Sequence, residues 1–245
     1  MTSSGSASPV IAFDALLPPE MAAKAEQIGV NKVKLDPLRL LALAVLAGAF
    51  IALGAIFSTN TLVGGEALPY GLRRLLAGLT FSLGLILVVV GGAELFTGNV
   101  LIVMAFANQR LRLRDLLYNW TVVYAGNLLG ALGTAVLLFL SDQYLLAQGQ
   151  VGLQALQIAQ AKCSLSFGSA LFLGVLCNVL VCLAVWLCFS ARTTSDKILA
   201  IIPPITAFVA CGFEHSIANM YFIPVGLLVK AAAPTSFWEL VGRQA

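Results

Sequence analysis

The sequence predicts an all-α membrane protein whose chain crosses the bilayer several times. Of its 245 residues, 60% are hydrophobic and only 10% are charged, a balance that separates it from ordinary soluble domains. Apolar stretches of about twenty residues recur along the chain, and this length lets a helix cross the hydrocarbon core of a bilayer. Two of the stretches contain a glutamate among glycines, which predicts broken helices, because irregular backbone and buried charge are tolerated only against protein or a water-filled cavity.

The composition argues against nucleic acids, metals and cofactors as partners. The formal net charge is +3, and no basic cluster alternates with aromatic residues, so no nucleic-acid surface is predicted. The five cysteines form no Cys-x-x-Cys pair and lie mostly in apolar stretches, where packing is expected rather than disulfide formation or metal binding. The N-terminus lacks the basic segment and apolar core of a signal peptide, so the membrane spans themselves must direct insertion.

Residues 1–37 are predicted to form a cytoplasmic N-terminal segment. Pro18 and Pro19 introduce a short helix that extends to about Val30. Its apolar residues recur at helical spacing, so we expect it to lie at the membrane surface. There it either anchors the chain or gates the mouth of a pore.

Residues 38–140 are predicted to cross the membrane three times. The apolar regions are residues 38–57, 75–107 and 116–140. The middle region is too long for one span and is broken near Gly91 to Asn99, so two half-helices joined by a loop are expected. The third region contains Gly126 and Gly130, a spacing that lets helices approach closely. A polar extracytoplasmic connector, residues 141–166, follows.

Residues 167–245 are predicted to form a second, incomplete set of spans. A fourth span covers residues 167–189, and a fifth apolar region covers residues 198–229. The fifth region contains a second break, bracketed by Pro203-Pro204 before it and Pro224 after it. Basic residues indicate the orientation: with the N-terminus inside, nine fall on the cytoplasmic side and five on the other, which favours a cytoplasmic N-terminus in a protein of the cell's inner membrane.

The two breaks resemble each other. Gly92 and Glu94 of the first break recur 120 residues later as Gly212 and Glu214. Broken helices at matching positions of two halves predict an inverted repeat of three plus three helices with a site at the membrane midplane. A partner for the third span would begin near residue 236, where only a few residues remain, so we expect a sixth span to be absent from this chain and present in a longer reading frame.

The second break also contains His215, the only histidine of the chain. Ionisable groups at membrane depth are costly and usually face a cavity or a bundle interior, where they mark a transport pathway. His215 is therefore the expected chemical centre of the protein.

Three motifs carry a resemblance to a known family. Residues 89–98 read VVGGAELFTG, residues 174–184 read GVLCNVLVCLA, and residues 212–220 read GFEHSIANM. The first two resemble the signatures of the formate/nitrite transporter family, and the third resembles the broken fifth helix of its formate channels. The resemblance covers residues 11–244. It implies an aquaporin-like protomer of six helices with its own pore, assembled as a homopentamer that conducts small monovalent anions through the lipid bilayer.

The resemblance also implies roles for residues at matching positions. Residues of the substrate pore would be His215, Thr97, Lys162 near the outer vestibule, and Asn178 of the fourth span. Residues of the constrictions would be Phe81, Leu85, Leu95 and Phe208. By spacing alone, the constriction residues look like ordinary core, and Lys162 is equally typical of a solvated loop.

Glu94 and Glu214 are predicted to be structural. A carboxylate that lined the pore would repel an anion, whereas a carboxylate beside a helix break can accept hydrogen bonds from backbone N–H groups. We therefore expect each glutamate to bind the N–H groups that its own break sets free.

The predicted function is a channel or transporter of small anions, with formate as the leading substrate. Lys162 would concentrate the anion, and the half-helix ends near Thr97 and Ser216 would offer free N–H groups. His215 would donate a hydrogen bond or a proton to the anion. Burial and the neighbouring Glu214 act in opposite directions on the charge of the imidazole, so its protonation state is open at this point. Nitrite and hydrosulfide remain alternative substrates.

Two other classes of function are weighed against this one. A neutral-solute channel of the aquaporin type also uses broken half-helices, but it would contain Asn-Pro-Ala repeats, which this sequence lacks. An intramembrane hydrolase would use Ser216 or Cys211 with His215. Adjacent serine and histidine in one helical segment point in different directions, and no Gly-x-Ser-x-Gly motif is present, so no enzyme is expected.

Overall fold

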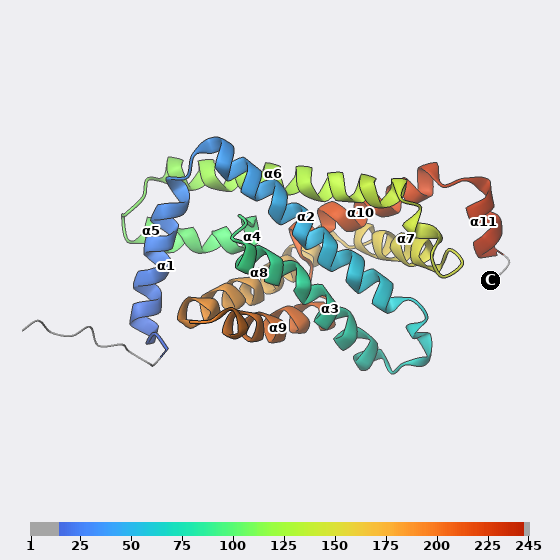
Figure 1. The fold of residues 1–245 in the computed structure, drawn as a ribbon, viewed down its shortest axis with the longest axis horizontal. Coiled ribbons are helices and arrows are strands. Elements are labelled where there is room, and N and C mark those ends of the chain that lie inside the picture. The colour runs from blue at the N-terminus through green and yellow to red at the C-terminus, as the bar shows by residue number, and fades with distance from the viewer. Residues whose placement is uncertain (1–14, 243–245) are drawn as a thin grey trace, which may run out of the picture.

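The computed structural model describes residues 15–242, which fold into helices joined by short loops, with no strand in that range (Figure 1). Residues 1–14 of the predicted N-terminal segment and residues 243–245 of the predicted second half lie outside the described residues. The helices are α1 (Pro18–Val33), α2 (Pro37–Leu62), α3 (Tyr70–Gly91), α4 (Phe96–Asn99), α5 (Val103–Ala107), α6 (Leu113–Leu140), α7 (Gln150–Cys163), α8 (Phe167–Ser190), α9 (Thr194–Ala210), α10 (Ser216–Ala232) and α11 (Thr235–Gly242). Short 3-10 turns are η1 (Gly65–Ala67), η2 (Val100–Ile102) and η3 (Gln143–Leu145).

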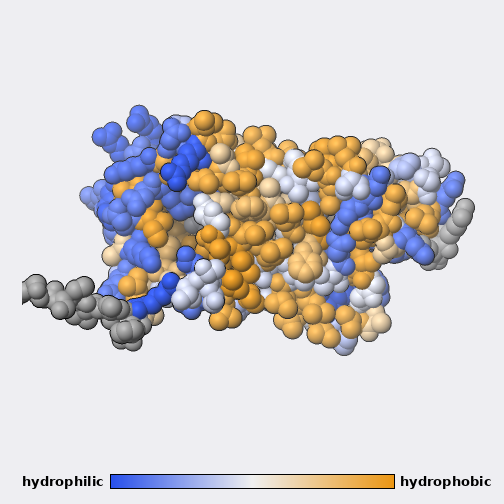
Figure 2. Space-filling view, viewed as in Figure 1, coloured by the Kyte–Doolittle hydropathy of each residue, from blue (hydrophilic) through white to orange (hydrophobic). Residues whose placement is uncertain are grey.

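The long helices have the length and composition of membrane spans. Within the described residues, α2, α3, α6 and α8 are each long and apolar enough to cross a bilayer, and α10 with α11 passes the same test as a pair bent by 101°. Figure 2 shows an apolar surface over the middle of the molecule, with hydrophilic residues gathered at the end that α1 covers and again at the opposite end. This is a multi-pass membrane protein.

Helix α2 lies at the centre of the bundle and packs against α3, α6 and α10. Asp36 caps its N-terminus by accepting hydrogen bonds from the N–H groups of Leu38 and Arg39, and Pro37 occupies the first helical position, where no N–H is needed. The close approach predicted from Gly126 and Gly130 is confirmed, since a Cβ atom at Gly130 would overlap with the carbonyl oxygen of Val45 on α2. Small residues therefore let the backbones of α2 and α6 touch.

Both predicted breaks are present. Helix α3 ends at Gly91 before α4 begins at Phe96, and α9 ends at Ala210 before α10 begins at Ser216. In each break a glycine adopts the left-handed conformation, with φ of 73° at Gly92 and 74° at Gly212, a backbone geometry that favours glycine. The prolines that bracket the second break lie inside α9 and α10. The inverted three-plus-three repeat remains a prediction, as does a sixth span.

Two further amphipathic helices pack onto the bundle, α1 across one of its ends and α7 alongside α10. Helix α1, at the left of Figure 1, covers one end and buries Met21, Ala25, Gly29 and Val30 against the helices beneath it. Helix α7 lies within the connector 141–166, where no helix was predicted. Its buried residues Val151, Ala155 and Ala159 recur every four positions, a helical period that the polar character of the connector concealed.

Candidate functional site

Two cavities lie on either side of the helix breaks. The first, the α1 cavity, has a volume of about 400 Å³ and is lined by α1, the C-terminal half of α3 and the first break. The second, the α7 cavity, has a volume of about 250 Å³ and is lined by α7, the beginning of α3 and the second break. Each cavity therefore joins one amphipathic helix to one break.

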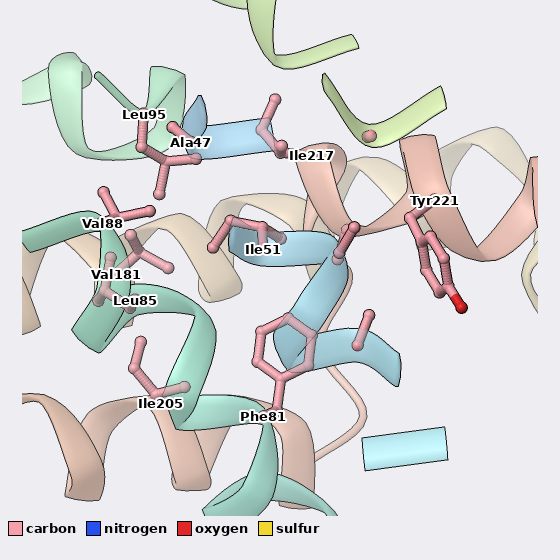
Figure 3. Packing of buried hydrophobic residues seen from close by; sticks show 14 of the residues in the cluster. Ala47, Ile51, Phe81, Leu85, Val88, Leu95, Val181, Ile205, Ile217 and Tyr221 are labelled. Carbon is pink, nitrogen blue, oxygen red and sulfur yellow. The ribbon is translucent and has the colours of Figure 1, made fainter. Parts of the chain in front are cut away.

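An apolar wall separates the cavities. Leu85 and Leu95 line the α1 cavity, while Phe81 and Phe208 line the α7 cavity. Their exposed fractions are only 2–3%, and the rings of Phe81 and Phe208 meet edge to face with centroids 5.5 Å apart. Figure 3 shows Phe81 and Leu85 projecting from successive turns of α3, with Leu95 across the space from Val88. An anion that passes between these side chains must lose its water, which is costly without a compensating donor.

His215 supplies a donor at this wall. It caps the N-terminus of α10, because its Nδ1 accepts a hydrogen bond from the N–H of Ala218 at 3.1 Å. In the neutral ring, Nε2 must then carry the proton. Nε2 faces the hydroxyl of Thr97 at 3.3 Å, and the ring stacks on Phe208 with a centroid distance of 5.7 Å. The break thus fixes one tautomer and directs its N–H toward Thr97.

Lys162 binds the second break. Its Nζ donates to Glu214 Oε2 at 2.7 Å, and the ammonium group lies 5.3 Å from the centre of the Phe222 ring. The same carboxylate oxygen accepts a hydrogen bond from Asn219 Nδ2 at 2.8 Å. The predicted vestibule lysine is therefore a part-buried residue of α7 that lines the α7 cavity, and it is not a solvated loop residue.

The first break carries a matching cluster. Lys32 of α1 donates to both carboxylate oxygens of Glu94 at 2.8 Å and to Asn99 Oδ1 at 2.9 Å. Asn99 Nδ2 donates to Glu94 at 2.7 Å and to Asn119 Oδ1 at 3.0 Å. Each break is thus held to an amphipathic helix by a lysine, a glutamate and an asparagine.

The expected partners of the two glutamates were wrong. Instead of backbone N–H groups, the carboxylates of Glu94 and Glu214 bind lysine ammonium and asparagine amide groups. The freed backbone finds other acceptors: the N–H of Glu94 donates to the carbonyl of Leu43, and the N–H of Glu214 donates to that of Leu173. A charged donor compensates a part-buried carboxylate better than a neutral amide does, since charge-assisted bonds are roughly twice as strong.

Asn178 lies apart from the other predicted pore residues. It lines a separate groove on α8 beside Val100 and Leu101, and its side-chain amide contacts Cys182 Sγ at 3.6 Å. Cys182 in turn donates to the carbonyl of Thr97, which connects the groove to the break without placing Asn178 on either cavity.

Four residues of the cavities and breaks were not predicted as site residues: Lys32, Arg74 and Asn99, which line the cavities, and Asn219, which binds Glu214. The 120-residue offset that relates the glutamates also relates Asn99 to Asn219, so the same repeat could have predicted the two asparagines. Lys32 and Lys162 are separated by 130 residues instead, because the helices that carry them lie outside the breaks. Arg74 has no counterpart in the motifs, and only the packing of α3 against α9 reveals it.

Comparison with known proteins decides the family. The formate/nitrite transporter family matches residues 19–243 of the chain. The chain belongs to the formate/nitrite transporter family. It is 47% identical over 230 residues to the formate channel FocA of Escherichia coli strain K12, which covers 94% of this chain and 81% of that one. It is 41% identical to FocA of Haemophilus influenzae, over 93% of this chain and 80% of the relative.

Solved structures agree with the sequence comparison. A pentameric formate channel with formate bound matches with a TM-score of 0.79 and 43% identity, over 84% of this chain and 81% of its own. An ion channel of the same family matches with a TM-score of 0.78 and 28% identity, over 91% and 90% of the two chains. The predicted family and the all-α membrane fold are therefore confirmed.

Among residues 15–242, no group of three or more histidine, cysteine or carboxylate side chains is arranged to hold a metal ion.

Proposed function

We propose that this protein is a channel for small monovalent anions that carries formate, as a homopentamer in the inner membrane with its N-terminus in the cytoplasm. The single observation that carries the proposal is the N–H of His215 Nε2, held at an apolar wall between two cavities that each contain a lysine. The names of the relatives support formate as substrate and five subunits as the assembly.

The cavities serve entry and the wall serves selection. Lys162 and Lys32 place an ammonium group in the α7 and α1 cavities. Each lysine is paired with a glutamate, so it provides a local cationic group for an anion to approach rather than a net charge. Between the cavities the closely packed side chains of Phe81, Leu85 and Phe208 admit only a small anion that has shed its water. The N–H of His215 then replaces one lost hydrogen bond to water at the most apolar point of the path.

Hydrogen bonding and protonation make different demands on His215. The neutral ring can donate from Nε2 while its Nδ1 remains bound to the N–H of Ala218. A ring that gives up a proton must first hold two, and the second proton would occupy Nδ1 and remove the cap of α10. Proton transfer to formate would therefore be coupled to local opening of the second break, whereas simple conduction would not.

The geometry gives no support to a hydrolase. Both ring nitrogens of His215 have partners other than Ser216, namely the N–H of Ala218 and the hydroxyl of Thr97. A serine nucleophile needs a base within hydrogen-bond reach. We infer that the protein is a transporter without catalytic activity.

The proposal is tested by comparing fluxes through purified protein in liposomes. Uptake of formate, nitrite and hydrosulfide is measured beside that of the neutral solutes water and glycerol, with protein-free liposomes as the control. We expect fast formate uptake, slower uptake of at least one other anion, and no acceleration for the neutral solutes. Accelerated glycerol flux without formate flux would overturn the anion channel in favour of a neutral-solute channel. If nitrite or hydrosulfide is taken up faster than formate, that anion would replace formate as the proposed substrate.

A further inference from the structure

Arg74 is a second cation of the α7 cavity that no motif assigns. It lies in the first turns of α3 and lines the cavity together with Lys162, Glu214 and His215. Its Nη2 donates to the carbonyl of Val209 and its Nε approaches that of Ala210 at 3.5 Å. The guanidinium group thus sits at the C-terminal end of α9, beside the second break.

The charges of the two cavities differ because of this residue. In the α1 cavity, Lys32 is paired with Glu94. In the α7 cavity, Lys162 is paired with Glu214, and Arg74 forms no ion pair with a carboxylate among the described residues. The pairs cancel in charge, so Arg74 gives the α7 cavity a net positive charge that the α1 cavity lacks.

The position of Arg74 also removes a source of repulsion. The C-terminus of a helix carries a partial negative charge of roughly one half, which would oppose an anion that approaches the break. Arg74 covers two of the terminal carbonyls of α9. A guanidinium has five N–H groups, of which two make these contacts, so the remainder are available to an anion in the cavity.

We propose that Arg74 attracts and positions the anion at the entrance formed by the α7 cavity. Salt, which screens this attraction, should therefore slow anion uptake from the α7 side more than uptake from the α1 side. This inference rests on the proposed anion channel. With the N-terminus in the cytoplasm, the α7 cavity is the outer entrance.

The test measures initial formate uptake in right-side-out and inverted vesicles at low ionic strength and in about 1 M potassium gluconate, where charges are screened within about 3 Å. Arg74→Gln removes the charge but keeps an N–H donor for the α9 carbonyls, and Arg74→Lys keeps the charge. The matched control is Arg73→Gln, because Arg73 is the neighbouring arginine on α3 and does not line the cavity.

We expect Arg74→Gln to lower uptake from the α7 side about three- to tenfold at low salt, with little change at high salt or from the α1 side. Arg74→Lys should retain most of the wild-type uptake from the α7 side, and Arg73→Gln should take up formate at the wild-type rate. An equal loss in both directions and at all salt concentrations would show that Arg74 only caps α9, and an equal effect of Arg73→Gln would show a general surface charge; either result overturns the inference.

The wild-type protein provides a second measurement in case Arg74→Gln does not fold. Its uptake from the α7 side should fall more steeply with salt than its uptake from the α1 side. Identical salt dependence from the two sides contradicts the role of Arg74 while leaving the anion channel intact. A wild-type protein that carries no anion overturns the proposed function, and the inference with it.

Discussion

At the scale of single residues, the two ring nitrogens of His215 have different partners, one for the helix cap and one for the proposed pathway. Its Nδ1 caps α10 by binding the N–H of Ala218, and its Nε2 is directed toward Thr97 at the apolar wall. The cap fixes which nitrogen carries the proton of the neutral ring. In the proposed channel, the hydrogen-bond donor that His215 offers to the anion therefore depends on the N–H of Ala218, three residues away.

Phe208 should control the size of the anion that passes. It lines the α7 cavity and contacts both Phe81 and His215, so Phe208→Ala removes a ring from the wall. We expect the preference for formate over acetate to fall about tenfold, since one methyl group in a close-fitting site is worth at least that factor. The measurement is the ratio of formate to acetate uptake in liposomes. The control is Leu199→Ala, whose side chain on the same helix is 68% exposed, and an unchanged ratio for Phe208→Ala would contradict a constriction at this position.

Part of the site could be predicted from the sequence and part could not. The position of His215 in a break follows from its cost at membrane depth, and the likeness of the two breaks followed from Gly92, Glu94 and their 120-residue repeat. The partners of the glutamates did not follow, because Lys32 and Lys162 come from helices outside the repeat pattern of the breaks. Contacts between distant segments are set by packing, which a local pattern does not record.

At the scale of elements, each break depends on an amphipathic helix. Lys32 of α1 compensates Glu94, whose side chain is only 7% exposed, and Lys162 of α7 does the same for Glu214. Removal of either lysine would leave a carboxylate in a poorly solvated position without a cation.

Lys32→Met should destabilise the protein by about 3 kcal/mol, or lower its Tm by about 10 °C. This value is at the lower end of the cost of removing one partner of a buried ion pair, because 26% of the Lys32 side chain is exposed. The double variant Lys32→Met, Glu94→Gln should recover part of the loss, since it removes the uncompensated charge. Thermal unfolding in detergent measures both, with the exposed Lys34→Met as control. Additive losses in the double variant would show that the two residues are not coupled.

The close contact between α2 and α6 should make the stability of the protein sensitive to a single added methyl group. A Cβ atom at Gly130 meets the backbone of α2, while no heavy atom of the described residues lies within 4 Å of one at Gly133 in the same helix. We expect Gly130→Ala to cost about 1–3 kcal/mol. Gly133→Ala should be neutral or stabilise by up to about 1 kcal/mol, as alanine favours a helix. The comparison of the two Tm values in detergent tests this, and equal values would mean that the helices separate freely.

At the scale of the whole molecule, the membrane fold followed from length and composition. The spans predicted at residues 38–57, 116–140 and 167–189 correspond to α2, α6 and α8, with ends that differ by a few residues. Helix α7 was not predicted, because its short apolar stripe lies within a polar connector and is buried by distant segments, chiefly α10, with smaller contacts to α2 and to Phe237 of α11. Hydropathy identifies the long membrane spans, but not a short amphipathic helix such as α7, whose apolar residues are buried only by packing against distant segments.

In the proposed channel, the pathway consists of two cavities, each with a lysine–glutamate pair, that meet at a wall with one hydrogen-bond donor. The α7 cavity contains Lys162 and Arg74, the α1 cavity contains Lys32, and His215 stands at the wall between them. The central claim is that His215 mediates passage of the anion between the cavities and couples it to pH when the cap on Nδ1 opens.

The most direct test is the pH profile of formate uptake by His215→Asn. Asparagine caps a helix as well as histidine does here but does not titrate, so folding should be retained, as thermal unfolding would verify. Between pH 5 and pH 8, after subtraction of uptake by protein-free liposomes, we expect wild-type uptake to rise as the pH falls and the uptake of His215→Asn to be lower and independent of pH. Superimposable profiles for the two proteins would contradict the role of His215 at the centre of the pathway.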